Sequence, residues 1–381
     1  MARALAGEAG CNFFYKSGSE FDEVFVGVGS KRIRELFKEA RKKKPAIIFI
    51  DEIDALTSQR NPMLSSVSRN TINQLLAEMD GFRKTENVIV IGATNLPQAI
   101  DKAVMRPGRF DKTIHVSLPD IEGRKNIIKF YLKRIKYDKE DVNINTLAQA
   151  STGFSGADIK NFVNIAILNC IREGRKMADN NDFEFALDRI TMGIGRKNMH
   201  VSEEDKLMTA YHEGGHTLVN LLTDGALPLH KVTILPRGPA LGFTAMLPDK
   251  DYHSQTRKQI LSHIDVALGG RIAEELIYGN EKITTGCSSD LQRATSLAYS
   301  FVRSYGMDSE ACLISSDKKS LSEAFNYRID QKVQNMLNES FLRTQNLLNI
   351  NKDKLDKLAD ELVKKETLSA QQIRELLNLK E

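Results

Sequence analysis

Short, fully apolar runs alternate with amphipathic helical stretches over the first third of the chain. Two of these runs, 46–50 and 88–92, have the uniform apolarity of strands that are buried on both faces of a parallel sheet. A helix-forming stretch at 71–79 separates them, and Ser30 is suited to cap a further helix before the first run. The alternation predicts an α/β domain, a parallel sheet covered by helices, over residues 1–118.

The hydrophobic pattern changes after this first domain. The β-like runs stop and apolar residues recur at helical spacing, which predicts a small helical subdomain over 119–197. A linker at 193–197 then leads to a third, mainly helical unit over 198–381, interrupted by a turn-rich β stretch at 231–247. The apolar spacing at 330–379 is helical without strict heptads, which favours packed helices over a coiled coil.

Composition and charge exclude several classes of function. The 381 residues carry 54 Lys and Arg against 50 Asp and Glu, a net charge of +4, so we expect no nucleic-acid groove. The four cysteines are far apart and form no C-x-x-C pair, which argues against a thiolate metal cluster or a disulfide framework. No apolar run approaches the roughly 18 to 20 residues that cross a bilayer, and the N-terminus does not resemble a signal peptide, so we expect the chain as given to be soluble.

The segment His212-Glu213-Gly-Gly-His216 carries the clearest chemical signal. Residues four apart lie on one face of a helix, so both imidazoles can reach one Zn²⁺ with Glu213 beside them. Zinc lowers the pKa of a water ligand to about 7 and polarises a scissile carbonyl, while the glutamate takes the proton and returns it to the leaving amine. The motif predicts a metalloprotease. The alternative is a helix with two unrelated histidines, and the two internal glycines by themselves weaken the helix.

A catalytic zinc site needs a third protein ligand. One class of zinc peptidases has a third histidine six residues beyond the second, but that position is Leu222 in this chain. A carboxylate must serve instead, and the candidates are Glu274, Glu275 and Asp290. Spacing alone does not choose among them.

A second set of polar residues follows the two predicted strands. Asp51 and Glu52 end the first strand, where such a pair can hold Mg²⁺ and polarise an attacking water, unless it only caps the next segment. Asn95 follows the second strand and can contact a γ-phosphate or the attacking water. Arg106 and Arg109 lie on a Pro-Gly loop that is suited to reach the γ-phosphate of a neighbouring subunit, although each alone could be a surface residue.

In this order, the motifs resemble those of the FtsH-type membrane AAA zinc metalloproteases along essentially the whole chain. The residues at 234–238 and 286–290 are most similar to those of the mitochondrial i-AAA branch, and the bacterial and plastid branches are nearly as similar. So many motifs in one order make coincidence negligible. The segments that carry the resemblance are 2–9, 19–21, 25–29, 50–54, 73–82, 106–111, 153–158, 211–216, 284–290 and 366–368.

The resemblance implies a hexameric ring that hydrolyses ATP with Mg²⁺, threads membrane or misfolded proteins through a pore and cleaves them with one Zn²⁺ per subunit. It implies a large AAA ATPase subdomain at 1–118, its helical lid at 119–197 and a zinc metalloprotease domain at 198–381. It also implies Asp290 as the third zinc ligand and Glu274 as a supporting carboxylate. The other roles that it implies are Walker B acids at Asp51 and Glu52, a sensor at Asn95, arginine fingers at Arg106 and Arg109, and a substrate-gripping pore loop at Phe25 and Gly27.

The chain departs from the family pattern in two places. Gly214 stands where the family usually has Ala or Thr, which leaves both ligands and the base in place. No G-x-x-x-x-G-K-[ST] phosphate loop occurs in the 381 residues, and the family's membrane anchor is missing as well. We therefore expect an N-terminally truncated chain, with a partial nucleotide-binding domain and impaired ATP hydrolysis.

Two other classes of function compete with the protease. A non-proteolytic AAA unfoldase would need only the acidic pair and the arginine loop, and His212, Glu213, His216 and Asp290 argue against it. A non-hydrolysing scaffold subunit in a mixed ring would explain the missing phosphate loop. The favoured expectation is a protease of an organellar membrane, the mitochondrial inner membrane first, with itself, protein substrates and, through an absent anchor, the membrane as partners. A bacterial plasma membrane or a plastid is the alternative location.

Overall fold

The structure is a computed structural model that describes residues 1–21, 27–57, 65–80, 87–193, 202–236, 241–248, 254–308 and 322–379. The chain divides into two compact units, Met1–Val116 and Ser117–Glu381, and each is described by itself. None of the helices in the described ranges combines the length and apolar character of a membrane-spanning segment.

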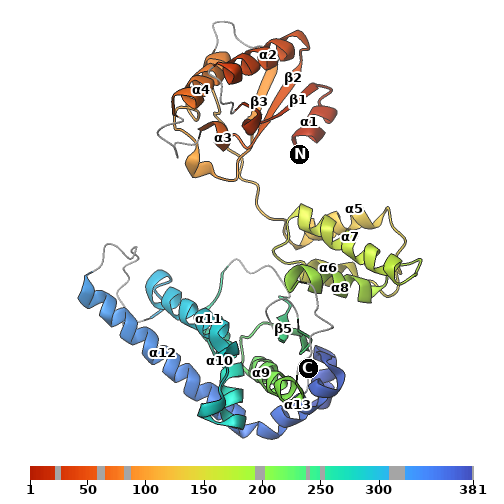
Figure 1. Cartoon of the computed structure of the whole chain (residues 1–381), viewed down its shortest axis with the longest axis vertical. Helices are drawn as coiled ribbons and strands as arrows, with labels where there is room; N and C mark the ends of the chain where they lie inside the picture. Colours follow the sequence, from red (N-terminus) through yellow and green to blue (C-terminus); the bar gives the residue numbers. More distant parts are fainter. Residues whose placement is uncertain are drawn as a thin grey trace. The chain divides into compact units, whose positions relative to one another are not determined.

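The first unit is a parallel sheet of order β1-β2-β3 with helices packed on it (Figure 1). The run predicted at 46–50 is confirmed as the buried strand β2, and the run at 88–92 is confirmed as β3. The expected burial on both faces is wrong for β3, because it is an edge strand of the described sheet and its Ile89 is 59% exposed. The strand β1 was not predicted because its apolar run, Phe13 to Tyr15, is only three residues long. Buried residues of α2, β2 and α4 form the core. The elements are β1 (Asn12–Ser17), β2 (Ala46–Asp51), β3 (Val88–Gly92), α1 (Ala2–Glu8), α2 (Val28–Lys42), α3 (Asp54–Thr57), α4 (Ser65–Asp80) and the short 3₁₀ turns η1 (Gly18–Phe21) and η2 (Pro97–Ala99).

The second unit begins with the expected helical subdomain. Asp120, Asn143, Ser155 and Asp179 each accept a backbone N–H at the start of a helix, so local sequence sets where these helices begin. Ile159 and Phe162 on one helix face pack with Phe183 of the next helix in a separate core. The helices are α5 (Ile121–Leu132), α6 (Ile144–Ala150), α7 (Gly156–Arg172) and α8 (Asn180–Thr191).

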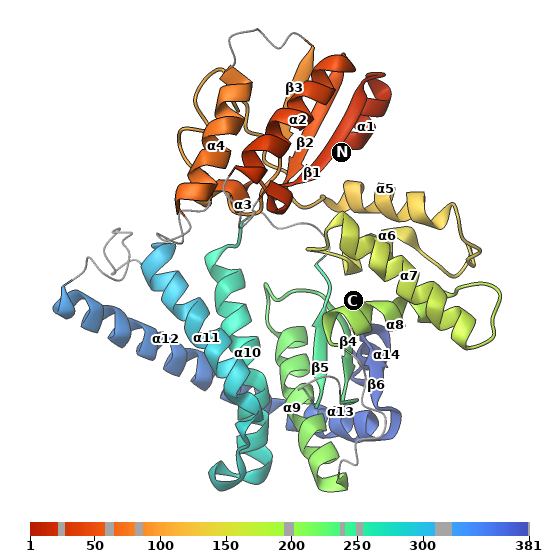
Figure 2. The ribbon, with the colours of Figure 1, turned by 45° about the horizontal axis from the view of Figure 1, so that its top comes forward.

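The remainder of the second unit is mainly helical and carries a small antiparallel sheet of order β5-β4-β6 (Figure 2). The β stretch predicted at 231–247 holds β4 and β5, while β6 is only three residues long and gives no sequence signal. The elements are α9 (Glu203–Leu222), β4 (Leu229–Thr233), β5 (Phe243–Met246), α10 (Arg257–Tyr278), η3 (Asn280–Lys282), η4 (Thr285–Cys287), α11 (Ser288–Tyr299), a π turn η5 (Ser300–Ser304), α12 (Glu323–Ile350), α13 (Lys352–Lys365), β6 (Thr367–Ser369) and α14 (Ala370–Leu376).

The helices α9 and α10 cross in direct backbone contact. A Cβ atom on Gly215 would lie 2.4 Å from the carbonyl oxygen of Gly269, and one on Gly269 would lie 2.8 Å from the carbonyl oxygen of Gly215. Only glycine fits at both positions, because real Cβ contacts do not come that close. One of the glycines that weaken the helical motif is therefore required for the crossing, which brings the motif against α10.

Candidate active site

Three side chains from α9 and α11 converge on one point. The Nε2 atoms of His212 and His216 lie 3.1 Å apart, and each lies 3.3 Å from Oδ2 of Asp290. The two histidines follow from their spacing on α9, whereas Asp290 is brought in from the first turn of α11. Among the described residues these three form the one cluster of His, Cys, Asp and Glu ligand atoms within 4.8 Å of one another.

The dimensions of this triangle fit a zinc ion. Ligand atoms about 2.0 to 2.1 Å from a tetrahedral Zn²⁺ stand about 3.3 Å from one another. The observed separations of 3.1, 3.3 and 3.3 Å match that geometry and leave the fourth position open. Two imidazoles and one carboxylate are also the donor types of a catalytic zinc site.

Hydrogen bonds on the far side of each imidazole fix its orientation. Nδ1 of His212 lies 2.7 Å from Oε1 of Glu274, and Nδ1 of His216 lies 2.7 Å from the carbonyl oxygen of Val266. Both acceptors place the proton on Nδ1, so the Nε2 lone pairs face the centre of the triangle. Glu274 is only 2% exposed and also accepts a hydrogen bond from the backbone N–H of Thr284, at 2.8 Å. The segment that leads to Asp290 is thereby tied to the carboxylate that orients His212.

The charges of the site are coupled. Burial lowers the pKa of His212, but hydrogen bonds to Asp290 and Glu274 outweigh it and raise that pKa to about 10. Burial opposes ionisation of Asp290 and Glu274, but their hydrogen bonds to the histidines hold both carboxyl pKa values below the usual range. The two carboxylates therefore favour positive charge at the imidazoles, which is a second proton on His212 in the metal-free chain and which a metal ion bound at the Nε2 atoms would replace.

Gly270 on α10 leaves room for both imidazoles. A Cβ atom there would lie 2.5 Å from Nε2 of His216 and 2.7 Å from Nε2 of His212. Any larger residue would push on the two ligand atoms themselves. The glycine is thus part of the cradle of the metal centre, although no motif marked it.

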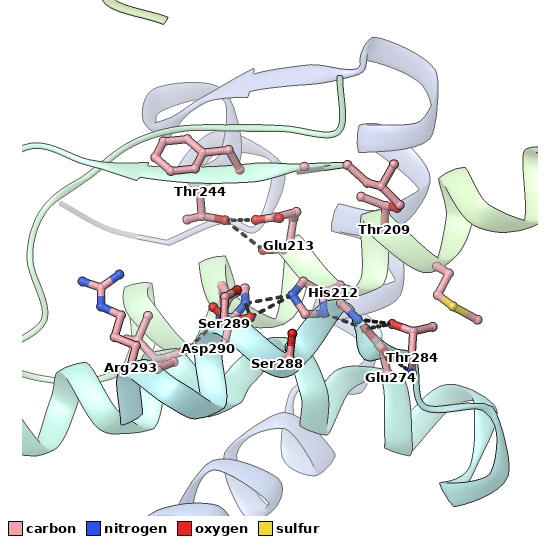
Figure 3. A pocket seen from close by; sticks show the side chains of 18 of the residues that line it. Thr209, His212, Glu213, Thr244, Glu274, Thr284, Ser288, Ser289, Asp290 and Arg293 are labelled. Atoms are coloured by element: carbon pink, nitrogen blue, oxygen red, sulfur yellow. Dashed lines mark hydrogen bonds and ion pairs between the residues drawn. The ribbon is translucent and has the colours of Figure 1, made fainter. Parts of the chain in front are cut away.

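Glu213 is on α9, and its side chain lies between that helix and the edge strand β5 (Figure 3). It is next to the ligand triangle, the three candidate ligand atoms of His212, His216 and Asp290. Its side chain is 7% exposed, and its Oε2 accepts a hydrogen bond of 2.6 Å from the hydroxyl of Thr244. A Cβ atom on Gly242 would lie 2.6 Å from Cγ of Glu213. The side chain expected as the base therefore lies next to the candidate ligands, where Thr244 binds one of its oxygens and Gly242 leaves room for it.

A cavity of about 850 Å³ opens over these residues. It is lined by α9, the β5 region, α10 and the segment from Thr284 to Arg293, so a peptide in it would lie between the edge strand and the ligand triangle. Glu275, the remaining carboxylate candidate, does not join the cluster and lies 3.8 Å from Arg271 on its own helix. The geometry therefore distinguishes Asp290, Glu274 and Glu275, the three candidates for the third metal ligand among which residue spacing could not choose.

The residues predicted to bind a nucleotide lie at or follow the carboxyl ends of the strands β2 and β3 in the first unit. Asp51 is the last residue of β2, and Glu52 follows it with a positive φ of 49°. The strands β2 and β3 are parallel with Ile50 opposite Gly92, so Asn95, three residues beyond β3, follows the same edge and is exposed. This arrangement is the one that ligands of α/β sheets use, at the carboxyl ends of the strands.

The two arginines of the predicted finger loop differ in their surroundings. Arg106 is exposed, whereas Arg109 is 18% exposed and its Nε lies 2.9 and 3.0 Å from the two carboxylate oxygens of Asp80. This hydrogen-bonded pair holds the pKa of the Asp80 carboxyl below its usual range. Arg109 is thus held within its own chain in this structure.

The predicted pore loop is described only in part. Phe25 lies outside the described residues. Gly27 immediately precedes α2 as its N-cap residue and has a φ of +88°, a left-handed conformation that favours glycine.

Four residues of the active site carried no sequence signal of their own. Thr244 and Gly242 belong to a turn-rich β stretch. Gly270 lies inside a predicted helix, where glycine has a low helix propensity. Thr284 belongs to the segment 284–290, in which the family resemblance points to Asp290 alone. The position of Gly270 inside a long helix is the one indication in the sequence of close packing at that residue.

A parallel α/β unit, a helical lid and a helical domain with a His-Glu-x-x-His motif in a candidate metal site are the features of AAA-linked zinc peptidases. Family models match in the same order: the ATPase family associated with various cellular activities at residues 1–118, the AAA+ lid domain at 141–185 and peptidase family M41 at 199–376. The chain belongs to the FtsH- and YME1-type AAA zinc metalloproteases. The expected family and fold class are confirmed.

Three similar relatives illustrate the range of the family. The ATP-dependent zinc metalloprotease FTSH 11, chloroplastic/mitochondrial, of Arabidopsis thaliana is 49% identical over 99% of this chain and 46% of its own length. The mouse ATP-dependent zinc metalloprotease YME1L1 is 46% identical over 99% of this chain and 53% of its own. The mitochondrial inner membrane i-AAA protease supercomplex subunit YME1 of Saccharomyces cerevisiae is 46% identical over 99% and 50%. The chain spans about half the length of these relatives.

Proposed function

We propose that the chain is the ATPase and protease part of an ATP-dependent zinc metalloendopeptidase that unfolds and degrades membrane or misfolded proteins. The observation that carries the proposal is the ligand triangle of His212, His216 and Asp290 with the carboxylate of Glu213 beside it. The names of the Arabidopsis and yeast relatives support a site of action in an organelle, the mitochondrial inner membrane first, and the yeast name supports assembly in a complex, which we propose is a hexameric ring.

His212, His216 and Asp290 would hold the zinc ion, which when bound acidifies a water molecule and polarises the scissile carbonyl. Proton transfer and the orientation of the ligands would depend on side chains of the protein. Thr244 holds Oε2 of Glu213, so we assign to Oε1 the proton taken from water and passed to the leaving amine. Glu274 keeps the His212 ring turned toward the ligand triangle, and the walls of the cavity exclude bulk water from the peptide.

Removal of the metal tests this proposal directly. We expect a chelator to abolish cleavage of an unstructured protein such as casein, and stoichiometric Zn²⁺ to restore it, because the remaining side chains cannot acidify water by themselves. Cleavage and zinc content are measured on the same samples. Full cleavage by protein that metal analysis shows to be zinc-free would contradict the assignment.

We further propose that residues 1–118 and 119–197 form the ATPase module and 198–381 the protease domain. ATP and Mg²⁺ would bind in the full-length protein at the sheet edge that carries Asp51, Glu52 and Asn95. Phe25 and Gly27 would belong to the pore loop that grips the substrate. The parallel sheet and the AAA family match support this module.

Arg106 and Arg109 are proposed to act on the nucleotide of the neighbouring subunit. Full-length Glu52→Gln and Arg109→Ala subunits should each lose ATP hydrolysis, by about 10³-fold for the arginine, and should partly regain it when mixed. The mixed ring restores one complete interface from two defective partners. ATP turnover and mixed assembly are both measured.

The pairing with Asp80 supplies the control for this experiment. Asp80→Asn removes the in-chain ion pair but keeps the arginine, so it should retain most of the hydrolysis. An equal loss in Asp80→Asn and Arg109→Ala, with no recovery in confirmed mixed rings, would mean that the arginine only stabilises its own subunit.

A further inference from the structure

The carboxylate of Glu213 needs more than its helix to hold it in place. The position of α9 fixes only its Cα atom, and the side chain has three rotatable bonds. A general base must present one oxygen to water, and a misplacement of about 1 Å can cost about 10²-fold in rate. The part of the chain that meets this carboxylate from the opposite side is the edge strand β5.

Two residues of the β5 region contact Glu213 from the same side. Gly242 and Thr244 are two positions apart, so in an extended chain they share one face. Thr244 donates a hydrogen bond of 2.6 Å to Oε2, and a Cβ atom on Gly242 would lie 2.9 Å from Oε1. The glycine thus leaves room for the carboxylate while the threonine holds one of its oxygens.

The hydroxyl of Thr244 is committed to this carboxylate. Its other neighbours, the hydroxyl of Thr217 and the backbone carbonyl of Glu213, are both 3.4 Å away. A hydroxyl has one proton to donate, and a charged acceptor at 2.6 Å is the stronger partner. Thr244 also faces Val232 across the β4–β5 pair, so the strand register fixes its backbone.

We propose that Thr244 is a positioning residue for the general base and that Gly242 provides the clearance that the arrangement needs. The hydroxyl fixes Oε2 and leaves Oε1, which lies on the Gly242 side, as the oxygen that takes the proton. The proposal rests on the proposed zinc-peptidase function of Glu213. It gives β5 a role in orienting the base in addition to lining the cavity.

A pair of substitutions separates the hydroxyl from the shape of the side chain. Thr244→Val keeps the β-branched shape and removes the donor, whereas Thr244→Ser keeps the donor. We expect Thr244→Val to lower kcat for an unstructured peptide by about ten-fold or more with KM and zinc content unchanged, and Thr244→Ser to stay within about three-fold of the original. Crystal structures of both variants should show the Glu213 carboxylate displaced only in Thr244→Val.

Thr367→Val is the matched control. Thr367 lies on β6, at the opposite edge of the same sheet, and its hydroxyl is 2.8 Å from that of Thr233, so the same substitution removes a hydroxyl contact far from Glu213. Its kcat should not change. A normal kcat in Thr244→Val, an equal loss in Thr244→Ser, or a loss that follows zinc content would overturn the positioning role. Full activity of Glu213→Gln would instead overturn the proposed function on which this role rests.

Discussion

Glu213→Gln is expected to lower the kcat for an unstructured peptide by at least about 100-fold while zinc content and thermal stability stay near those of the original protein. General-base contributions are typically about 10² to 10⁴-fold, and an amide cannot take the proton. The substitution adds little volume, and the amide oxygen still accepts the hydroxyl of Thr244. The three ligand atoms of the metal centre are not changed. Steady-state kinetics and metal analysis on one preparation check both statements.

Glu275→Gln is the matched control for this prediction. Glu275 is a carboxylate of α10 that pairs with Arg271 rather than with the ligand cluster, so the same chemical change should leave kcat close to the original value. Undiminished casein cleavage by purified Glu213→Gln protein would remove Glu213 from the role of general base.

The sequence predicted β2 because it is buried on both faces, and it predicted β3 because the run at 88–92 is apolar, although Ile89 on this edge strand is 59% exposed. Ile48 and Ile50 of β2 are almost fully buried, and a uniformly apolar run is the pattern that such strands produce. The strand β1 has only a three-residue apolar run, Phe13 to Tyr15, between Asn12 and Lys16. The strand β6 has only three residues and exists because it pairs with β4, a contact that lies more than 130 positions away in sequence. Local patterns therefore find strands that have a long apolar run and miss strands that depend on pairing with a distant part of the chain.

The same limit applies to the active site. His212, Glu213 and His216 could be predicted because one turn of a helix brings them together. The partners of this turn come from other elements, and neither spacing nor composition reports where α10, α11 and β5 pass. Resemblance to a family was needed to prefer Asp290, and Thr244 had no signal at all. Helix propensity is a local property, so Gly215 was expected only to weaken the helix. Its role is to allow the close contact with Gly269 on α10.

The two carboxylates next to the histidines should differ in what their loss does to zinc. Asp290 contributes one of the three ligand atoms, so Asp290→Ala should weaken zinc binding by more than about 100-fold and abolish cleavage. Glu274 contacts only the far side of His212, and the loss of such a partner typically costs about 10 to 100-fold in metal affinity or activity. Zinc affinity measured by competition with a chelator of known strength distinguishes the two.

Isosteric variants sharpen the comparison because they leave no cavity. Asp290→Asn keeps an oxygen but loses the charge that faces both imidazoles at 3.3 Å, so zinc binding should still fall steeply. Glu274→Gln has one acceptor oxygen for two donors, the His212 ring N–H and the Thr284 backbone N–H, so one donor meets an NH₂ group and a smaller loss is expected. A zinc-free Glu274→Gln protein beside an Asp290→Asn protein with full zinc content would reverse the roles assigned to these carboxylates.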